Sequence, residues 1–300
     1  MLNDKCLGSG LDRSVDEWAE LGGQNNTYCM LSASGFEMSN VKRLAPKEKS
    51  MEESYIKTGE RIDDLQLKGL KIIQNPSWFC YGIDAVLLSS FADIRKNEKV
   101  VDLGTGTGVI PLLLYGKYSP SKIIGVEIQK DVADMAARSV KLNKIEDIIY
   151  IKEGNIKDCY NELGKGCFDV VVSNPPYKKG KTGIINPKDT KAISRHEILI
   201  NLDEILNTVN CLLKPGGRFY MIHRPERLKD IILGFEKNKL TPKRMRFVYP
   251  NIHKAPNMLL IEASKMGGDF LKFEPPLCVY NDDGSYSDEI NKIYGLLGDE

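Results

Sequence analysis

Short apolar runs alternate with amphipathic segments along most of the chain from Lys99 onward. The runs are rich in β-branched residues and read VVDLG, KIIGVEI, IIYIKEG, FDVVVS and RFYMIH. Runs of this kind are typical of strands that are buried on both faces. The segments between them space their apolar residues three or four positions apart, as a helix does. The alternation therefore predicts an α/β fold with a doubly wound, mostly parallel sheet and helices on both faces.

The segments on either side of this alternation have different patterns. Ahead of it, LKIIQNPSWFC predicts short or irregular strands, and Asp84 is predicted to cap a helix over residues 85–92. After it, RMRFVYPN and NMLLIEASK predict an antiparallel strand pair at the C-terminal edge of the sheet.

Residues 1–50 lack apolar periodicity and are rich in serine, glycine, asparagine and charged residues. A chain of this composition buries too little apolar surface to fold alone. We therefore expect a disordered extension, or a start assigned too far upstream, because a second methionine, Met51, precedes the first patterned segment. Residues 51–300 are expected to form one folded domain.

Composition narrows the class of protein only in part. With 300 residues, of which 42% are hydrophobic, the chain can bury a large core. Its 42 basic and 41 acidic residues leave a net charge of +1, which neither requires nor forbids a nucleic acid partner. The seven cysteines form no Cys-x-x-Cys pair, and no two of the three histidines share a metal-binding spacing. We therefore expect reduced thiols, a cytoplasmic location and no metal.

No apolar run approaches the roughly 18 residues that a membrane span needs, and the first residues lack the apolar core of a signal peptide. We expect no membrane attachment and no export. We also expect a monomer or a weak dimer.

The sequence VVDLGTGTG places Gly104, Gly106 and Gly108 between a predicted strand and a predicted helix. Glycines at such a turn let the backbone approach a ligand closely, and the helix N-terminus offers unpaired amides. The next predicted strand ends in Glu127, whose carboxylate can bind both hydroxyls of a ribose. This pattern is the nucleoside-binding half of a Rossmann-like site.

The glycine spacing and Asp102 indicate which nucleoside binds there. The Gly-x-Gly-x-Gly spacing differs from the Gly-x-Gly-x-x-Gly pattern that binds a pyrophosphate. Asp102 would repel a phosphate, whereas its negative charge suits the ammonium and sulfonium groups of S-adenosylmethionine. We therefore expect S-adenosylmethionine as the cofactor.

A buried run ends in Asn174, Pro175, Pro176 and Tyr177, which are the predicted catalytic residues. Because proline cannot donate to a sheet ladder, the chain must leave the sheet at Asn174. The Asn174 side-chain oxygen and the Pro175 carbonyl can accept both hydrogens of a planar amine, and the prolines hold these acceptors rigidly. Tyr177 offers a ring on which a base can stack. We assign no catalytic base, since the amine becomes strongly acidic after attack.

The motifs VVDLGTGTG, VEIQ and VVSNPPY together resemble the class I S-adenosylmethionine-dependent methyltransferases that act on planar nitrogens. Other segments are similar to those of the bacterial tRNA adenine methyltransferases that modify the adenine beside the anticodon of a valine tRNA. These segments include QNPSWFCYGIDAVLLSSFA, SRHE, LLKPGGRFYMIHRPERL and RFVYPNIHKAPNMLLIEASKMGG. The resemblance covers about residues 60–298 and implies methyl transfer to the exocyclic amine of that adenine.

The resemblance also implies roles for residues outside the two motifs. Asn155 would accept a hydrogen bond from the adenine amine of the cofactor, and Tyr81 and Asp84 would cover the cofactor. The three loop glycines would wrap its methionine and ribose parts. The cofactor half of the domain would then span about residues 82–160, and the acceptor and RNA half about residues 168–300.

Cationic side chains follow the acceptor motif directly, where they can neutralise RNA phosphates while Tyr177 binds a splayed loop base. The predicted RNA-binding residues are Lys178, Lys179, Lys181, Arg195 and His196. A second basic group consists of Lys243, Arg244 and Arg246.

Three other functions stay open at this point. A release-factor glutamine methyltransferase shares the acceptor motif, because a side-chain amide also presents a planar nitrogen. That family typically has a larger helical domain before the sheet and a shorter tail. A ribosomal RNA or DNA adenine methyltransferase would share the chemistry. The third alternative is an RNA-binding protein that keeps the fold but has lost catalysis. Such a protein is expected to lose residues of the glycine loop or the acceptor motif, and both are intact here.

Overall fold

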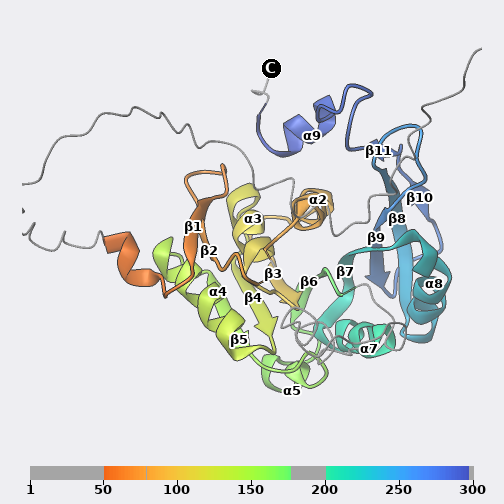
Figure 1. Cartoon of the computed structure of the whole chain (residues 1–300). Helices are drawn as coiled ribbons and strands as arrows, with labels where there is room; N and C mark the ends of the chain where they lie inside the picture. Colours follow the sequence, from red (N-terminus) through yellow and green to blue (C-terminus); the bar gives the residue numbers. More distant parts are fainter. Residues whose placement is uncertain (1–50, 79, 177–200, 297–300) are drawn as a thin grey trace, which may run out of the picture. The chain divides into compact units, whose positions relative to one another are not determined.

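The computed structural model describes residues 51–78, 80–176 and 201–296, which form an α/β domain (Figure 1). Within these ranges, nine strands form one sheet in the order β10-β8-β9-β7-β6-β3-β4-β5, with β11 also paired to β8. Their bounds are β3 Lys99–Leu103, β4 Lys122–Glu127, β5 Ile149–Glu153, β6 Phe168–Ser173, β7 Leu213–His223, β8 Leu240–Tyr249, β9 Met258–Lys265, β10 Lys272–Phe273 and β11 Leu277–Cys278. Strands β5, β4, β3, β6 and β7 pair in parallel, whereas β9 is antiparallel to both of its neighbours. The predicted fold class and the antiparallel pair are confirmed.

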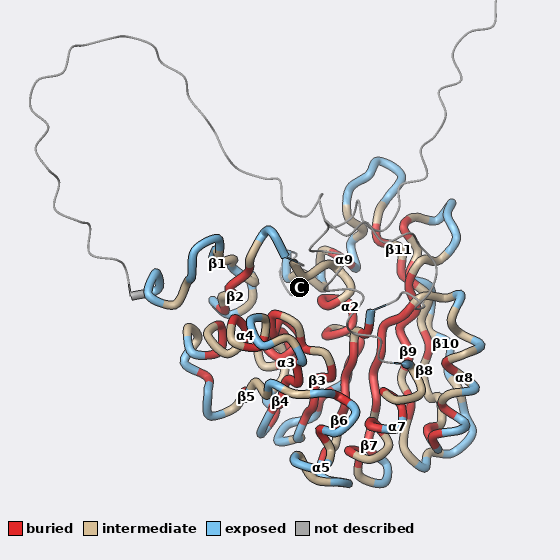
Figure 2. The backbone as a smooth tube through the Cα atoms, turned by 60° about the horizontal axis from the view of Figure 1, so that its bottom comes forward, coloured by how far each residue is buried: buried red, intermediate tan, exposed pale blue. Residues whose placement is uncertain are grey.

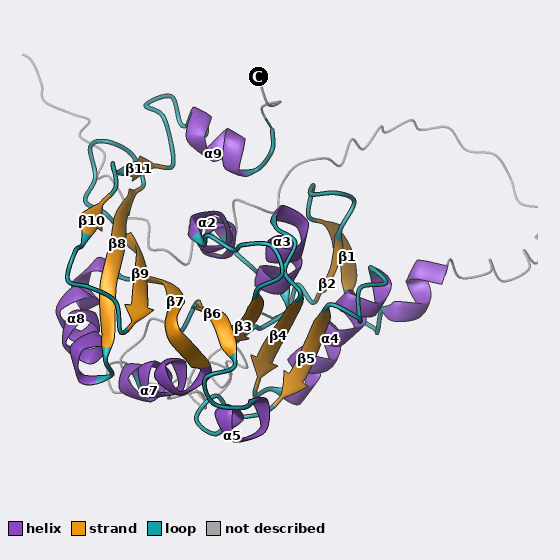
Figure 3. Ribbon diagram, turned by 180° about the vertical axis from the view of Figure 1, so that it is seen from behind, coloured by secondary structure: helices purple, strands orange, loops and turns teal. Residues whose placement is uncertain are grey.

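Helices cover both faces of the sheet (Figure 3). One face carries α2 (Ile83–Phe91), α3 (Val109–Lys117) and α4 (Lys130–Leu142). The other face carries α5 (Cys159–Leu163), α7 (Leu202–Leu212) and α8 (Leu228–Lys237). Short helical segments complete the described part, namely η2 Met51–Tyr55, η3 Pro225–Arg227 and α9 Asp288–Ile293. In α4 the buried residues Ala133, Ala136 and Val140 recur three or four positions apart, as the helical period requires.

The central strands are buried along almost their whole length (Figure 2). Val100 and Val101 in β3, and Val170 and Val171 in β6, expose none of their surface. Both strands read as continuous apolar runs because helices cover both faces of the sheet. Each such valine contributes about 1.5–3 kcal/mol of burial free energy, so the strand ends that carry the predicted site are held rigidly.

A small hairpin precedes the sheet and packs on α4. It pairs β1 (Arg61–Asp64) with β2 (Lys71–Gln74) in antiparallel fashion. The N–H of Ile73 donates to the Ser139 hydroxyl at 2.9 Å, and the Asn143 side chain both donates to and accepts from the β2 backbone. Just before β1, Glu60 accepts two hydrogen bonds from Arg138 at 2.6 and 2.7 Å. These contacts fix the segment that leads into α2.

The C-terminal segment folds back beside α2. The rings of Tyr280 and Tyr286 stack with centroids 5.2 Å apart, and Tyr294 stacks on Tyr286 at 5.8 Å. Helix α9 lies against α2. Arg246 of β8 binds Glu289 of α9 through two hydrogen bonds at 2.6 and 2.8 Å. The segment is therefore a structural part of the domain.

One local prediction is wrong. Helix α2 begins at Ile83 with Gly82 as its N-cap, so Asp84 lies in the first turn and does not cap the helix. The sequence KPGG predicts the end of a helix, and α7 does end directly before it, at Leu212, with Leu213 as its C-cap. The KPGG residues themselves belong to β7. The register between β6 and β7 shifts at these residues, and Gly216 adopts the positive φ of 75° that this irregularity needs.

The described part contains no helix that is long and apolar enough to cross a bilayer. Its cysteines are free thiols, namely Cys80, Cys159, Cys167, Cys211 and Cys278.

Candidate active site

The glycine loop and the acceptor motif follow neighbouring strand ends. Leu103 of β3 and Ser173 of β6 are register partners, so Gly104 and Asn174, the next residues, leave the sheet side by side. The buried Ser173 hydroxyl donates to the Leu103 carbonyl oxygen at 2.8 Å, which ties the two strand ends together. The structure thus brings the predicted cofactor and acceptor residues to one edge of the sheet, where parallel sheets bind ligands.

The loop after β3 has a backbone conformation that favours glycine. Gly104, Gly106 and Gly108 have φ values of 79°, 54° and 83°, in the region that disfavours a β-carbon. A β-carbon at Gly108 would lie 3.2 Å from that of Ala136 in α4, whereas one at Gly106 would meet nothing within 4 Å. Gly108 therefore permits close helix packing, and Gly106 leaves room beside the loop for a ligand.

Glu127 ends β4 and turns its side chain to the glycine loop. Its Oε2 accepts the N–H of Gly106 at 3.0 Å, and its Oε1 accepts the N–H of Gln129 at 2.9 Å. A carboxylate has about four lone-pair sites, so Glu127 is fixed in orientation and can still accept from ribose hydroxyls. The next residue, Ile128, exposes 40% of its surface and offers apolar area against which a purine can pack. Ile128 was not among the predicted site residues, and its only signal in the sequence is its place after the acidic strand end.

Asp102 in β3 is fully buried, and among the described residues neither of its carboxylate oxygens has a hydrogen-bond partner. Burial raises the pKa of Asp102 to about 7, and the charge of Glu127 adds to the rise. The nearby Thr105 hydroxyl lowers the pKa of Asp102 in part. Its geometry does not make a hydrogen bond to the carboxylate. A buried carboxylate without a donor costs folding free energy unless a ligand supplies one. An ammonium group would do so, and the charge of S-adenosylmethionine fits this site.

Asn174 is half-buried at the end of β6, and its amide nitrogen donates to Oδ2 of Asp84 at 2.9 Å. Because a carboxylate only accepts, the nitrogen must face Asp84, and the amide oxygen is turned away from it. Pro175 is buried and Pro176 is exposed. The family resemblance implied that Asp84 covers the cofactor, whereas the structure joins its side chain to the acceptor motif.

The other predicted cofactor residues lie in loops between the elements. Asn155 follows β5, is exposed, and accepts the N–H of Lys157 on its side-chain oxygen at 3.0 Å. Tyr81 donates its N–H to the Gln74 side chain at 3.1 Å, and burial raises the pKa of its phenol. Some of the predicted site residues lie outside the described part, namely Tyr177, Lys178, Lys179, Lys181, Arg195 and His196.

Arg244 and Arg246 have acidic partners within the chain. Arg244 pairs with Glu262 at 2.8 Å and places its guanidinium 4.1 Å from the Phe91 ring centroid. Arg246 pairs with Glu289 at 2.6 Å, and its side chain is only 15% exposed. We therefore withdraw these two arginines from the predicted RNA-binding surface, because internal carboxylates neutralise their charges.

Two histidines lie in the described part, and neither belongs to a metal cluster there. His223 ends β7, and its Nδ1 accepts the N–H of Arg224 at 2.8 Å. Burial, together with the charge of Arg227, lowers the pKa of His223 to about 4, so its ring is neutral at physiological pH. His253 is exposed and lies 3.2 Å from Asp282.

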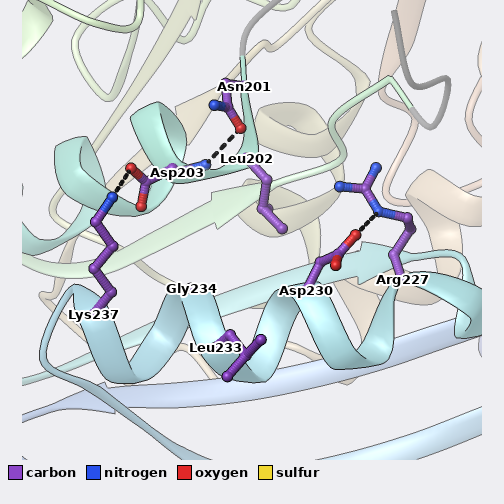
Figure 4. A pocket seen from close by; sticks show the side chains of 8 residues that line it. All are labelled: Asn201, Leu202, Asp203, Arg227, Asp230, Leu233, Gly234 and Lys237. Atoms are coloured by element: carbon purple, nitrogen blue, oxygen red, sulfur yellow. Dashed lines mark hydrogen bonds and ion pairs between the residues drawn. The ribbon is translucent and has the colours of Figure 1, made fainter.

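A surface pocket of about 280 Å³ lies between the start of α7 and α8 (Figure 4). Its lining residues are Asn201, Leu202, Asp203, Arg227, Asp230, Leu233, Gly234 and Lys237. Its charged groups are bound to one another, as Arg227 is to Asp230 at 2.7 Å and Lys237 to Asp203 at 2.5 Å. The pocket shares no residue with the glycine loop or the acceptor motif, so we do not assign it to the active site.

A glycine loop and an Asn-Pro-Pro turn follow adjacent strand ends of this sheet, an arrangement typical of a methyltransferase. The chain belongs to the family described as Methyltransferase small domain, whose family model matches residues 69–233.

Similar proteins agree with this membership. The tRNA1(Val) (adenine(37)-N6)-methyltransferase of Porphyromonas gingivalis is 31% identical over 239 residues, which cover 77% of this chain and 93% of that protein. The protein of the same name from Photobacterium profundum is 27% identical, over 68% of this chain and 85% of its own length. A predicted O-methyltransferase from Agrobacterium tumefaciens has the same fold, with a TM-score of 0.58 and 19% identity over 71% of this chain and 95% of its own.

Proposed function

We propose that the protein transfers a methyl group from S-adenosylmethionine to the exocyclic amine of an adenine in the anticodon loop of a tRNA. The observation that carries the proposal is the position of Asn174 directly beside the glycine loop, with its amide orientation set by Asp84. The names of the relatives indicate the substrate, which would be a valine tRNA with its adenine next to the anticodon.

The residues around the glycine loop fit the cofactor. When bound, S-adenosylmethionine supplies a methyl group on a positively charged sulfur, which an amine can attack directly. Glu127 would hold the ribose hydroxyls, and Asp102 would accept from the ammonium group. The Gly104–Gly108 backbone would lie along the methionine and ribose parts, while Asn155 and Tyr81 would contact the adenine end and cover the site. We therefore assign binding and orientation of the cofactor to these residues.

The acceptor residues would orient the target amine. The lone pair of an adenine amine is delocalised into the ring, so it is a poor nucleophile. The Asn174 side-chain oxygen and the Pro175 carbonyl would each accept one hydrogen of this amine, which favours a pyramidal nitrogen with its lone pair directed at the methyl group. Tyr177 would stack on the base, a contact worth about 1–3 kcal/mol. Positioning would then supply most of the rate, and no general base is needed before attack.

The RNA would lie along the stretch after the acceptor motif. Lys178, Lys179, Lys181, Arg195 and His196 would contact phosphates and the loop, which makes binding dependent on salt. Residues 51–300 would form the catalytic domain, and residues 1–50 an extension outside it. The enzyme would act in the cytoplasm as a monomer or a weak dimer.

A methyl-transfer assay tests the proposal. Tritiated S-adenosylmethionine is incubated with total tRNA and with either the wild-type protein or Asn174→Ala. We expect the wild-type protein to transfer labelled methyl groups to tRNA. The rate of transfer should be at least about 100-fold lower in Asn174→Ala. If wild-type protein transfers no label to tRNA and labels a protein instead, the proposal is wrong.

A further inference from the structure

One hydrogen bond joins the acceptor motif to a helix on the face of the sheet. The Asn174 amide nitrogen donates to Oδ2 of Asp84 at 2.9 Å, across 90 residues of sequence. Asp84 lies in the first turn of α2, and Asn174 is the first residue after β6. The contact therefore couples the acceptor residue to a part of the chain that precedes the whole sheet.

The Asp84 carboxylate favours one of the two orientations of the Asn174 amide. A side-chain amide has a donor end and an acceptor end, and rotation by 180° about its last bond exchanges them. The target amine offers two hydrogens, so only the oxygen end of Asn174 can bind one of them. With its nitrogen end toward the amine, Asn174 would place donor against donor. A carboxylate at position 84 accepts only, so it favours the orientation that methyl transfer needs.

Both partners are held in place by other contacts. Oδ1 of Asp84 accepts the N–H of Ala85 at 2.9 Å, which fixes the carboxylate on the helix. At the other end of α2, Arg244 donates to the Phe91 carbonyl at 2.6 Å. On the strand side, Ser173 ties β6 to β3 at the residue before Asn174. The donor and the acceptor therefore meet between two rigid elements.

We propose that Asp84 is a positioning residue for methyl transfer, because it fixes the flip state of the Asn174 amide and so presents the amide oxygen to the amine of the target base. The inference rests on the proposed function. In this role Asp84 contacts the nitrogen end of the Asn174 amide, and it would touch neither the base nor the methyl group. Asp84 then belongs to the acceptor side of the site, even though it precedes the cofactor loop in sequence.

A reciprocal swap tests the inference. Asp84→Asn leaves an amide that can donate or accept, so the orientation of Asn174 is no longer fixed. Asn174→Asp places two carboxylates against each other. The double variant Asp84→Asn/Asn174→Asp restores one donor facing one acceptor and still leaves a carboxylate oxygen for the target amine. We expect kcat to fall about 10- to 100-fold in Asp84→Asn and further in Asn174→Asp, while the double variant is at least about tenfold faster than the slower single variant.

Controls separate positioning from folding and from substrate binding. The Kd for S-adenosylmethionine and the KM for tRNA should stay within about threefold of wild type in Asp84→Asn, because the contact acts on kcat. Asp93→Asn makes the same change at an exposed position just after α2 and should behave as wild type. Thermal unfolding with saturating S-adenosylmethionine checks that each variant folds.

The possible outcomes separate the positioning role of Asp84 from the proposed function. Rescue in the double variant supports the positioning role. A double variant whose loss equals the product of the two single losses, or Asp84→Asn with wild-type kcat, would overturn it. If the wild-type protein itself fails to methylate tRNA, the proposed function is wrong, and that failure is visible before any variant is compared.

Discussion

The carboxylate of Glu127 accepts the backbone N–H of Gly106 at 3.0 Å, which links the end of β4 to the middle of the glycine loop after β3. One side chain therefore shapes the loop and presents acceptors for a ribose. Loop shape and cofactor affinity should change together when this carboxylate is altered.

Glu127→Gln should weaken S-adenosylmethionine binding by about 10- to 100-fold. The substitution removes hydrogen bonds to a charged acceptor, each worth about 1.5–3 kcal/mol, and turns an NH2 group toward a backbone N–H. Isothermal titration with S-adenosylmethionine measures the change. Glu153→Gln is the matched control, because Glu153 is the register partner of Glu127 in β5 and is exposed. Equal affinity of wild type and Glu127→Gln would contradict the assigned role.

Asp102 should make the stability of the cofactor-free protein depend on pH. Burial raises the pKa of Asp102 from 3.8 to about 7, so between these values the folded chain binds a proton that the unfolded chain has lost. The free energy of unfolding must then decrease as pH rises from about 4 to 7, by roughly 4 kcal/mol at most from this group. Denaturant titrations across this pH range measure the slope.

Asp102→Asn should remove this slope and stabilise the cofactor-free protein at pH 8, because no charge is then buried. The same variant should bind S-adenosylmethionine more weakly, and wild-type affinity should fall below pH 7 as the carboxyl group becomes protonated. A variant that is less stable than wild type at pH 8 without the cofactor would show that Asp102 has a favourable internal partner.

Alanine at two of the loop glycines should have different effects. Both positions have positive φ, so each substitution costs about 1 kcal/mol of backbone strain. Gly108→Ala also forces its β-carbon to within 3.2 Å of Ala136, so we expect the larger loss of stability there. Gly106→Ala has room in the fold and should mainly lower cofactor affinity. Denaturant unfolding and cofactor titration of both variants distinguish the effects, and identical profiles would contradict this assignment.

Arg246→Ala should destabilise the C-terminal segment and leave the salt dependence of tRNA binding unchanged. Its guanidinium makes two hydrogen bonds to Glu289, so hydrogen exchange of α9 should become faster. Lys181→Ala should instead lower the slope of log Kd against log salt by about 0.7 to 0.9. If Arg246→Ala changes this slope by as much, Arg246 contacts RNA despite its ion pair.

The sequence predicted those parts of the fold that depend on local periodicity. The apolar runs at Val100–Leu103 and Val170–Val172 predicted parallel buried strands, and the residues after them predicted the positions of the glycine loop and the acceptor motif. The glycine loop and the acceptor motif could be placed together because the carboxyl ends of parallel strands meet at one edge of a sheet.

The parts that sequence could not predict depend on distant partners. Asp84 has the local pattern of a helix cap, and only the fold brings it to Asn174. Arg246 belongs to a basic run whose neutralising carboxylate, Glu289, lies 43 residues away. The bulge at KPGG depends on pairing between β6 and β7. The glycines and the proline alone indicate a turn, and they do not show that these residues belong to a strand.

The chemical identity of the product decides whether the protein methylates the adenine amine of a tRNA. A valine tRNA transcript is incubated with the protein and S-adenosylmethionine that carries a deuterated methyl group, then digested to nucleosides and analysed by mass spectrometry. We predict deuterated N6-methyladenosine, located beside the anticodon when the digest is made with a base-specific nuclease. Recovery of the transcript without the label, or with the label on a ring nitrogen or a ribose, would contradict the account.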